Sequence, residues 1–355
     1  MHLEGHALSP EYERHLWKKR FFLLLLCGAS LIILIFSIAT GAVSIPPLEV
    51  VKALAGKGDP RWSIIVWNIR LPQTLAAFLA GAGLSLAGAV MQSVLRNPLG
   101  SPFTLGISNA AAFGAAFSII ILGSGSMQSS AADAVTIASP FLTTGMAFVA
   151  ALGCMVVVLA VASASRGTPE AMILAGVALS SLFTAGTMFL QYFARDDQLA
   201  AAVFWSFGDV GRATWRDIPL MGGLLLGAFA FFFFRRFDLN ALDCGDEAAL
   251  GLGVSAPRIR LEAMVITSLL SAVTVALLGV IGFVGLVCPH MLRRFLGSDH
   301  RFLLPGSVLL GGMLLLGADV GARLIFAPRV LPVSVFTAFL GAPVFLALII
   351  RRRRL

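Results

Sequence analysis

The sequence predicts an all-α integral membrane protein whose subunit crosses the bilayer with ten helices. Hydrophobic residues make up 58% of the 355 positions and charged residues only 12%, against about 25% charged residues in an ordinary soluble domain. Several segments of about 20 residues carry almost no charge, which is the length a helix needs to cross a hydrocarbon layer of about 30 Å. The chain lacks the weaker alternation of an outer-membrane barrel. A water-soluble fold is therefore excluded.

Ten apolar segments are expected to form the membrane helices. They cover residues 21–43, 65–94, 103–123, 135–162, 170–193, 218–235, 261–281, 284–297, 303–323 and 332–350. The eighth segment is too short to cross alone, so residues 280–296 are expected to form a broken or partly re-entrant element buried among its neighbours. The chain then divides into a cytoplasmic segment (1–20), a single transmembrane domain (21–350) and a basic cytoplasmic tail (351–355).

The basic residues indicate the orientation of these helices. Most of the 26 Lys and Arg residues fall in segments that face inward if the N-terminus is cytoplasmic, which places both termini in the cytoplasm. The net charge of +8 therefore has a topological explanation, and no basic patch interleaved with aromatic residues suggests nucleic acid. The basic residues Lys18, Lys19 and Arg20 precede an apolar stretch longer than a signal-peptide core, so that stretch is interpreted as a retained helix.

The sequence contains no pattern that indicates a disulfide framework, a metal site or a nucleotide-binding site. The four cysteines have no C-x-x-C spacing, so neither a disulfide framework nor a zinc site is indicated. His290 lacks a second ligand three or four residues away and is interpreted as a structural residue at a helix terminus, so no metal site is expected. No G-x-x-x-x-G-K-[ST] loop occurs, so any ATP must be hydrolysed by another subunit.

The longest polar segments are 44–63 and 194–217, expected to face outward, and 236–260, expected to face inward. The third contains a short helical pattern after Leu242 that ends near Gly251 and Gly253. The acidic residues Asp243, Asp246 and Glu247 precede its apolar part and favour a helix N-terminus. An exposed helix with Ala248, Ala249, Leu250 and Leu252 is suited to a groove in a cytoplasmic partner; a helix lying on the lipid surface is the alternative.

Two further patterns lie inside the spans. Asp319 and Arg323 are four residues apart on one predicted helix, a spacing at which opposite charges meet. They form either an intrahelical pair at the outer end of the helix or a charge offered to an external partner. Small residues recur at Gly81, Ser85 and Ala89, and at Gly279, Gly282 and Gly285, a spacing that allows close approach of helix backbones in lipid.

From about residue 65 to the C-terminus, the sequence resembles the FecCD family of ABC importer permeases, which carry vitamin B12, ferric siderophores and haem. The matching residues are, in order, Ile69-Arg70-Leu71-Pro72, Gly81, Gly88, Gln92, Arg96-Asn97-Pro98-Leu99, Pro102, Leu105-Gly106, Leu174-Ala175-Gly176-Val177, Trp205, Gly208, Leu239-Asn240, Gly251-Leu252-Gly253-Val254, the stretch from Gly279 to Val287, Pro289-His290, Arg293, Asp299-His300-Arg301, Leu304-Pro305, Asp319, Arg323, Leu331-Pro332 and Gly341-Ala342-Pro343.

The resemblance implies a BtuC-like permease fold and a homodimer around a central translocation pathway in the bacterial inner membrane. It also implies two ABC ATPase subunits, which bind the ATP and Mg²⁺, and a periplasmic or lipid-anchored binding protein. The residues that the family pattern assigns to coupling are Asp243, Asp246, Glu247, Leu250 and Gly251; those assigned to docking of the binding protein are Arg70 and Arg323; and those assigned to the cytoplasmic gate are Asn97, Leu99, Thr168 and Glu170.

The chain departs from the family pattern at three places. Gln73 follows Leu71-Pro72 where many relatives have Arg, Ser334 follows Val333 where they have Gly, and Pro169-Glu170 replaces small hydroxyl residues of the gate loop. The expected cargo is a ferric siderophore, with haem and cobalamin as alternatives. An ion-coupled secondary transporter and a membrane-embedded enzyme are the rival classes, but midplane ionisable residues, inverted repeats and a His/Asp/Glu constellation are not evident.

Overall fold

The computed structural model describes residues 10–41, 44–127, 135–137, 139–165, 168–325 and 330–352. This described part is mostly helical and contains one short antiparallel strand pair. The elements are α1 (Pro10–Ala39), α2 (Pro47–Leu54), α3 (Pro60–Ile65), a π-helical turn (Val66–Arg70), α4 (Leu71–Val94), α5 (Ile107–Ile120), β1 (Gly125–Met127), β2 (Val135–Ile137), α6 (Pro140–Ala164), α7 (Pro169–Tyr192), α8 (Asp196–Ser206), a 3-10 turn (Val210–Arg212), α9 (Asp217–Phe234), α10 (Arg236–Asp243), α11 (Asp246–Gly251), α12 (Ala256–Leu278), α13 (Val284–Leu296), α14 (His300–Leu324) and α15 (Val333–Arg352).

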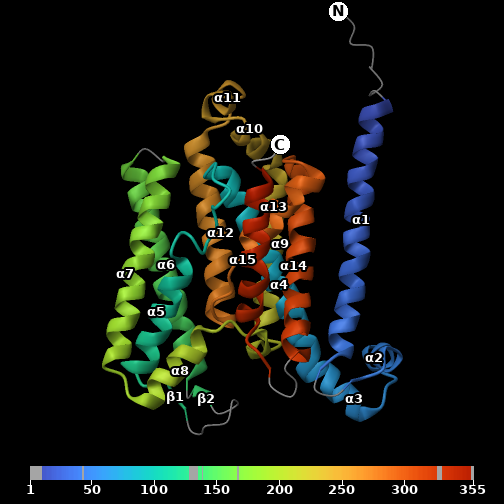
Figure 1. The fold of residues 1–355 in the computed structure, drawn as a ribbon, viewed down its shortest axis with the longest axis vertical. Helices are drawn as coiled ribbons and strands as arrows, with labels where there is room; N and C mark the ends of the chain where they lie inside the picture. Colours follow the sequence, from blue (N-terminus) through green and yellow to red (C-terminus); the bar gives the residue numbers. More distant parts are fainter. Residues whose placement is uncertain are drawn as a thin grey trace, which may run out of the picture.

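The long helices run roughly parallel to one axis, and the short elements gather at its two ends (Figure 1). The first helical residue of α1 and the last turn of α15 lie at the same end as α10 and α11. The elements α2, α3, α8 and the strand pair lie at the opposite end. This arrangement agrees with the predicted separation of the polar segments, so the two ends are called here the coupling end, which carries α11, and the outer end.

Each of the ten predicted spans corresponds to one long or medium helix, α1, α4, α5, α6, α7, α9, α12, α13, α14 and α15. In the described part of the chain, seven helices are long and apolar enough to cross a membrane, and the apolar α5 and α15 are shorter. Several boundaries differ from the prediction by a few residues, and two of these differences change how a segment is interpreted. The helix α1 begins at Pro10, within the segment expected to precede the domain, and α6 begins at Pro140 because residues 135–137 pair as a strand.

The expected broken element lies between α12 and α13. Gly279 has a φ of 81° and Phe283 a φ of 68°, so the backbone leaves the helical path over these residues before α13 begins. His290 lies within α13 and faces Phe345, so the interpretation of this residue as a helix terminus was wrong.

The core of the subunit is α4, which is buried along almost its whole length. It contacts α9, α12, α13 and α14. At two helix crossings the backbones are so close that only glycine fits. A Cβ at Gly81 would collide with the carbonyl oxygen of Gly311, and a Cβ at Gly88 with that of Gly285. The expected close approach is therefore confirmed at Gly81 and Gly285, whereas no atom lies near a Cβ built on Gly282.

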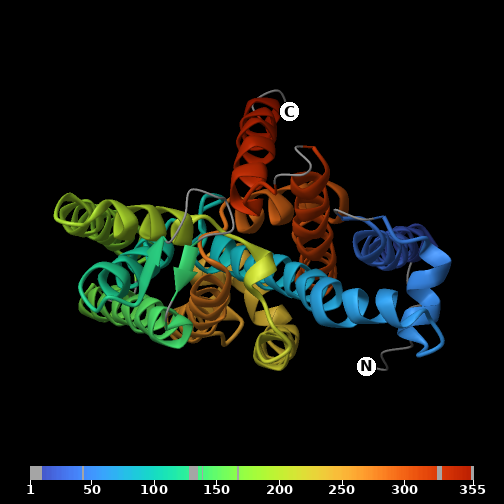
Figure 2. The same cartoon turned by 90° about the horizontal axis from the view of Figure 1, so that it is seen from below.

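Seen from the outer end, α7 and α15 lie on one side of the molecule, whereas α6, α9 and α12 lie on the other (Figure 2). The helix α7 is almost unburied in the subunit and exposes Leu174, Leu182 and Phe189. The helix α15 likewise exposes Phe339 and Leu346. Apolar side chains of this size on two helices of the same side indicate a surface that another apolar phase or another protein covers.

Candidate coupling and gate sites

The acidic-to-apolar segment forms two short helices at the coupling end. The sequence predicted α11, whereas α10 was not predicted. Asp246 and Glu247 occupy the first turn of α11, as expected for a helix N-terminus. Ala249 faces inward and is buried, while Leu250 and Leu252 are each 72% exposed. The helix α11 projects from the end of the molecule (Figure 1), and these two leucines give it an exposed apolar edge.

A buried arginine ties α11 to the core. Arg260, near the start of α12, is 2% exposed. Its Nη2 donates to Asp246 Oδ1 at 2.6 Å, and its Nε donates to the carbonyl oxygen of Val94 at 2.8 Å. Arg260 thereby links the first turn of α11 to the last turn of α4. Its hydrogen bond to the carboxylate holds the pKa of Asp246 below its usual range.

The turn that follows α4 has an unusual backbone. Arg96 has a φ of 47°, a left-handed conformation that glycine usually supplies at a helix end. The amide of Arg96 donates to Ser93 O and that of Asn97 to Gln92 O, which together close a Schellman motif. A non-glycine residue in this conformation costs about 1–2 kcal/mol, and the positive charge of Arg96 also acts on Asp246.

Of the two segments expected to form the gate, only one lies beside α11. A cavity of about 480 Å³ brings Thr168 and Glu170, at the start of α7, together with Arg96, Asp246 and Arg260. By contrast, Asn97 and Leu99 do not line this cavity. The Asn97 side chain accepts a hydrogen bond from the Leu99 amide at 2.8 Å and so shapes its own loop, and Leu99 is exposed. The structure thus places Thr168 and Glu170, but not Leu99, beside the first turn of α11.

A second network joins α10 to α4 and α14. The His300 side chain is 0% exposed, and its Nε2 lies 3.0 Å from Ser93 Oγ and 3.2 Å from Asp243 Oδ2. The backbone amide of His300 donates to Asn240 Oδ1, and Asn240 in turn donates to Asp299. Asp243, which the sequence grouped with α11, therefore holds α10 against the helix ends.

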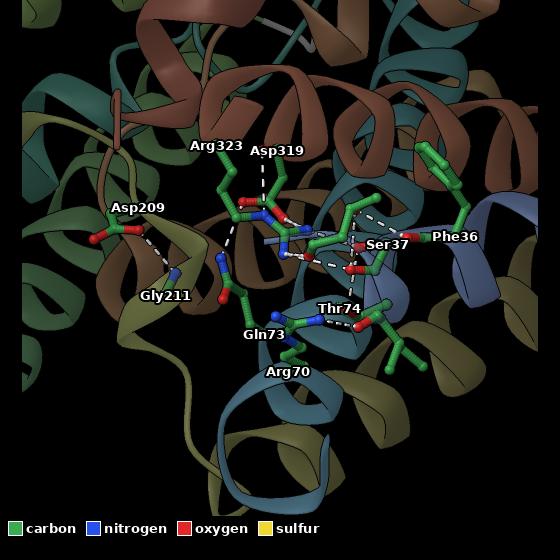
Figure 3. Close-up of polar contacts among 11 residues, drawn as sticks. Phe36, Ser37, Arg70, Gln73, Thr74, Asp209, Gly211, Asp319 and Arg323 are labelled. Atoms are coloured by element: carbon green, nitrogen blue, oxygen red, sulfur yellow. Dashed lines mark hydrogen bonds and ion pairs between the residues drawn. The ribbon is translucent and has the colours of Figure 1, made fainter. Parts of the chain in front are cut away.

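At the outer end, Arg70 and Arg323 point into the subunit (Figure 3). Arg70 is 6% exposed and donates to the carbonyl oxygens of Ile38 and Ala39 at the end of α1. Arg323 is 8% exposed, and its Nη2 lies 2.7 Å from Asp319 Oδ2. The intrahelical pair is confirmed. The docking expectation requires an exposed charge, and this burial argues for a structural role that fixes α1.

Gln73 and Ser334, two of the departures from the family pattern, have defined partners. The Gln73 amide donates to Asp319 Oδ1 at 3.1 Å, so it satisfies the oxygen that does not pair with Arg323 (Figure 3). The Ser334 hydroxyl accepts from the Gly208 amide at 3.0 Å, and the Ser334 amide donates to Gly208 O. Ser334 therefore holds the loop after α8 against the start of α15.

Comparison with known proteins agrees with this architecture. The family model described as the FecCD transport family matches residues 29–351. The chain belongs to the FecCD transport family. This permease is 49% identical to an ABC transporter permease protein of Methanocaldococcus jannaschii, over 97% of this chain and 98% of the relative. It is 36% identical to the hemin transport permease HmuU of Yersinia pestis, with 91% of this chain and 95% of the relative covered.

The permease also has a solved structural relative. It matches a chain described as an inward-facing conformation of a metal-chelate type ABC transporter with a TM-score of 0.81 and 29% identity, covering 94% of this chain and 99% of the other. It is also 37% identical to the vitamin B12 import permease BtuC of Escherichia coli, over 94% of this chain and 96% of the relative. The predicted all-α, multi-pass permease fold is therefore confirmed.

Sequence reasoning missed Arg260 and the interior role of His300. Arg260 lies at the start of an apolar helix, where a basic residue is ordinarily a solvated anchor, and its partner is 14 residues earlier across a turn. No periodic spacing connects them. The role of His300 could have been inferred from the sequence, because His300, Asn240 and Asp299 are all among the residues that match the family pattern. The structure brings these three residues into contact.

We predict that Asp246→Asn destabilises the permease, because Arg260 loses its charged partner while remaining buried. A hydrogen bond to a charged group contributes about 1.5–3 kcal/mol. The thermal unfolding temperature of the purified permease should therefore decrease. The matched control is Asp238→Asn in α10, whose partner Arg235 is one-third exposed. Equal effects of the two substitutions would show that the buried link has no special role.

Proposed function

We propose that this permease is the membrane subunit of an ATP-driven importer of a metal chelate, with a ferric siderophore as the first candidate and haem or cobalamin as alternatives. Relatives named for hemin, vitamin B12 and Fe(3+)-citrate import support this class of cargo. All three named cargoes are metal ions held in organic ligands. The chain itself is a transport subunit, and ATP with Mg²⁺ binds to a separate ABC ATPase.

The observation that carries the proposal is the exposed apolar edge of α11. Leu250 and Leu252 are each 72% exposed on a helix that projects from the end of the molecule. A short helix with such an edge fits a groove in a partner. Through Asp246 and Arg260, a displacement of α11 acts directly on the end of α4. This end is then cytoplasmic, as are both termini, and the membrane is the bacterial inner membrane.

A homodimer completes the proposed importer. The exposed apolar helices α7 and α15 lie on one side of the subunit (Figure 2), so a second copy facing this side would enclose a pathway between the two subunits. A binding protein would deliver the chelate at the outer end. ATP binding would draw the two ATPase subunits together and shift the α11 helices, which switches rigid elements between two packings.

The proposal is tested by reconstituting the permease in vesicles with and without an ABC ATPase subunit and a cargo-loaded binding protein. Uptake of labelled ferric siderophore, haem and cobalamin is measured in parallel. We expect uptake of one chelate only when the ATPase and ATP are both present. Uptake by the permease alone along an ion gradient would overturn the proposal in favour of a secondary transporter.

A further inference from the structure

A deep lateral crevice lies between α6 and α9. Both helices pack against α12, and the space between them encloses about 1400 Å³. In the view from the outer end, these three helices lie on the side of the molecule away from α15 (Figure 2). The crevice is therefore separate from the side proposed to face the second subunit, and because its lining residues Phe141 and Leu220 are exposed, it opens on the outer surface of the subunit.

The walls of the crevice are apolar. On α6 they extend from Phe141 to Phe148, on α9 they include Leu220 and Leu224, and on α12 they include Val273. Eight residues of helix from Pro140 rise about 12 Å, which is most of the outer half of a hydrocarbon layer about 30 Å thick. Gly145 lies midway along this lining stretch of α6, and no atom lies within 4 Å of a Cβ built there. The crevice is thus open at the position where a side chain would fill it.

The outer mouth of the crevice is polar and carries tryptophan. Trp215 stacks on Trp67, with ring centroids 6.0 Å apart, and donates its Nε1–H to the carbonyl oxygen of Trp67 at 2.7 Å. Tryptophan at this level is typical of the interface between hydrocarbon and headgroups. The mouth therefore lies where the glycerol and phosphate groups of an outer-leaflet lipid are found.

Most of the charged side chains at the mouth already form hydrogen bonds within the protein. Asp209 accepts from the Gly211 amide, and Asp217 accepts from the amide and hydroxyl of Thr214. Arg212 donates to three backbone carbonyls around the end of α8. Arg216 is exposed, and among the described residues no hydrogen bond or ion pair of its side chain is found. Its guanidinium group can therefore form charge-assisted hydrogen bonds with a phosphate.

We propose that this crevice binds one phospholipid of the outer leaflet, with an acyl chain between α6 and α9 and the phosphate at Arg216. The apolar wall matches the chain, the depth matches one leaflet, and the unpaired cation stands at the phosphate level. A hydrophilic chelate would gain nothing from the apolar wall. The inference depends on membrane insertion and not on the identity of the cargo.

The test uses phosphatidylglycerol with a photoactivatable diazirine midway along one acyl chain, in vesicles of phosphatidylethanolamine and phosphatidylglycerol that contain the purified permease. Cross-linked peptides are mapped by mass spectrometry. We expect labelling of residues 141–148 and 220–224. Gly145→Leu should remove most of it by filling the crevice. The matched control is Gly153→Leu on the same helix, where a Cβ also meets no atom within 4 Å but the residue does not line the crevice.

A second variant tests the phosphate contact without altering the packed helices. Arg216→Gln should lower labelling by about tenfold, which corresponds to the loss of one charge-assisted contact, whereas Arg195→Gln, an exposed arginine at the same end, should not. A diacylglycerol with the same diazirine should label weakly. Equal labelling by diacylglycerol, or equal labelling of the Gly145→Leu and Gly153→Leu variants, would show ordinary annular lipid and overturn the site. Uptake is not measured, so a failure here is separate from a failure of the proposed transport function.

Discussion

The double substitution Glu247→Arg with Leu250→Asp is expected to abolish chelate uptake and cargo-stimulated ATPase activity while leaving the permease folded. Both residues lie on the exposed side of α11, so neither change disturbs the buried Ala249. The first reverses a charge at the start of the helix, and the second places a charge on its apolar edge. A side chain that acts as a hot spot of an interface contributes about 2 kcal/mol or more to binding. Co-purification of the ATPase subunit and uptake by the reconstituted complex are the measurements.

A control variant separates this effect from a general effect of surface charge. Leu48 of α2 is 66% exposed at the outer end, so Leu48→Asp makes the same chemical change on a short helix that is not expected to contact the ATPase. It should leave ATPase binding intact. If the double variant of α11 takes up chelate normally, the assignment of α11 to coupling is wrong.

The substitution Gly88→Ala is expected to prevent folding of most of the permease. An added Cβ would collide with the carbonyl oxygen of Gly285, where backbone meets backbone and no side chain can move aside. Overpacking of a core costs about 1–3 kcal/mol and occasionally more, and here α4 and α13 would have to separate. The yield of monodisperse protein in size-exclusion chromatography, together with its thermal unfolding, measures the loss.

The matched control for this loss is Gly223→Ala in α9, where no atom lies within 4 Å of the added Cβ. Alanine is favoured over glycine within a helix by about 1 kcal/mol, so this variant should be as stable as the parent or slightly more stable. A Gly88→Ala protein with normal yield and unfolding temperature would show that the crossing of α4 and α13 can relax.

The long apolar segments made the helices of this fold predictable. Length and the scarcity of charge located the ten spans, and the short segment before Leu296 gave the interruption between α12 and α13. The helices α2 and α10 were not recognised because each has only eight residues and lies in a segment interpreted as a polar loop. Their packing on longer helices determines their structure. The start of α6 was placed too early because an apolar pattern over residues 135–137 does not distinguish a strand from a helix.

The candidate site was predictable only in part. The pattern of α11 identified its exposed edge, since acidic residues followed by apolar residues and two glycines are a local signal. The burial of Arg70 and Arg323 could not be foreseen, because a charge near a helix end is compatible with both solvent and an interior carbonyl. The ion pair of Asp319 was recognised from its spacing, but the contact of Gln73 with this carboxylate joins residues far apart in the sequence.

The helix α4 is engaged at both of its ends by buried arginines. At one end, the carbonyl oxygen of Val94 accepts a hydrogen bond from Arg260. At the other, Arg70 in the preceding turn donates hydrogen bonds to the last carbonyl oxygens of α1. The 24 residues of α4 span about 36 Å without a proline in the middle. A displacement of α11 can therefore be transmitted along this rigid helix to the opposite end of the molecule. The two ends can then move together without a relay of individual side-chain rearrangements.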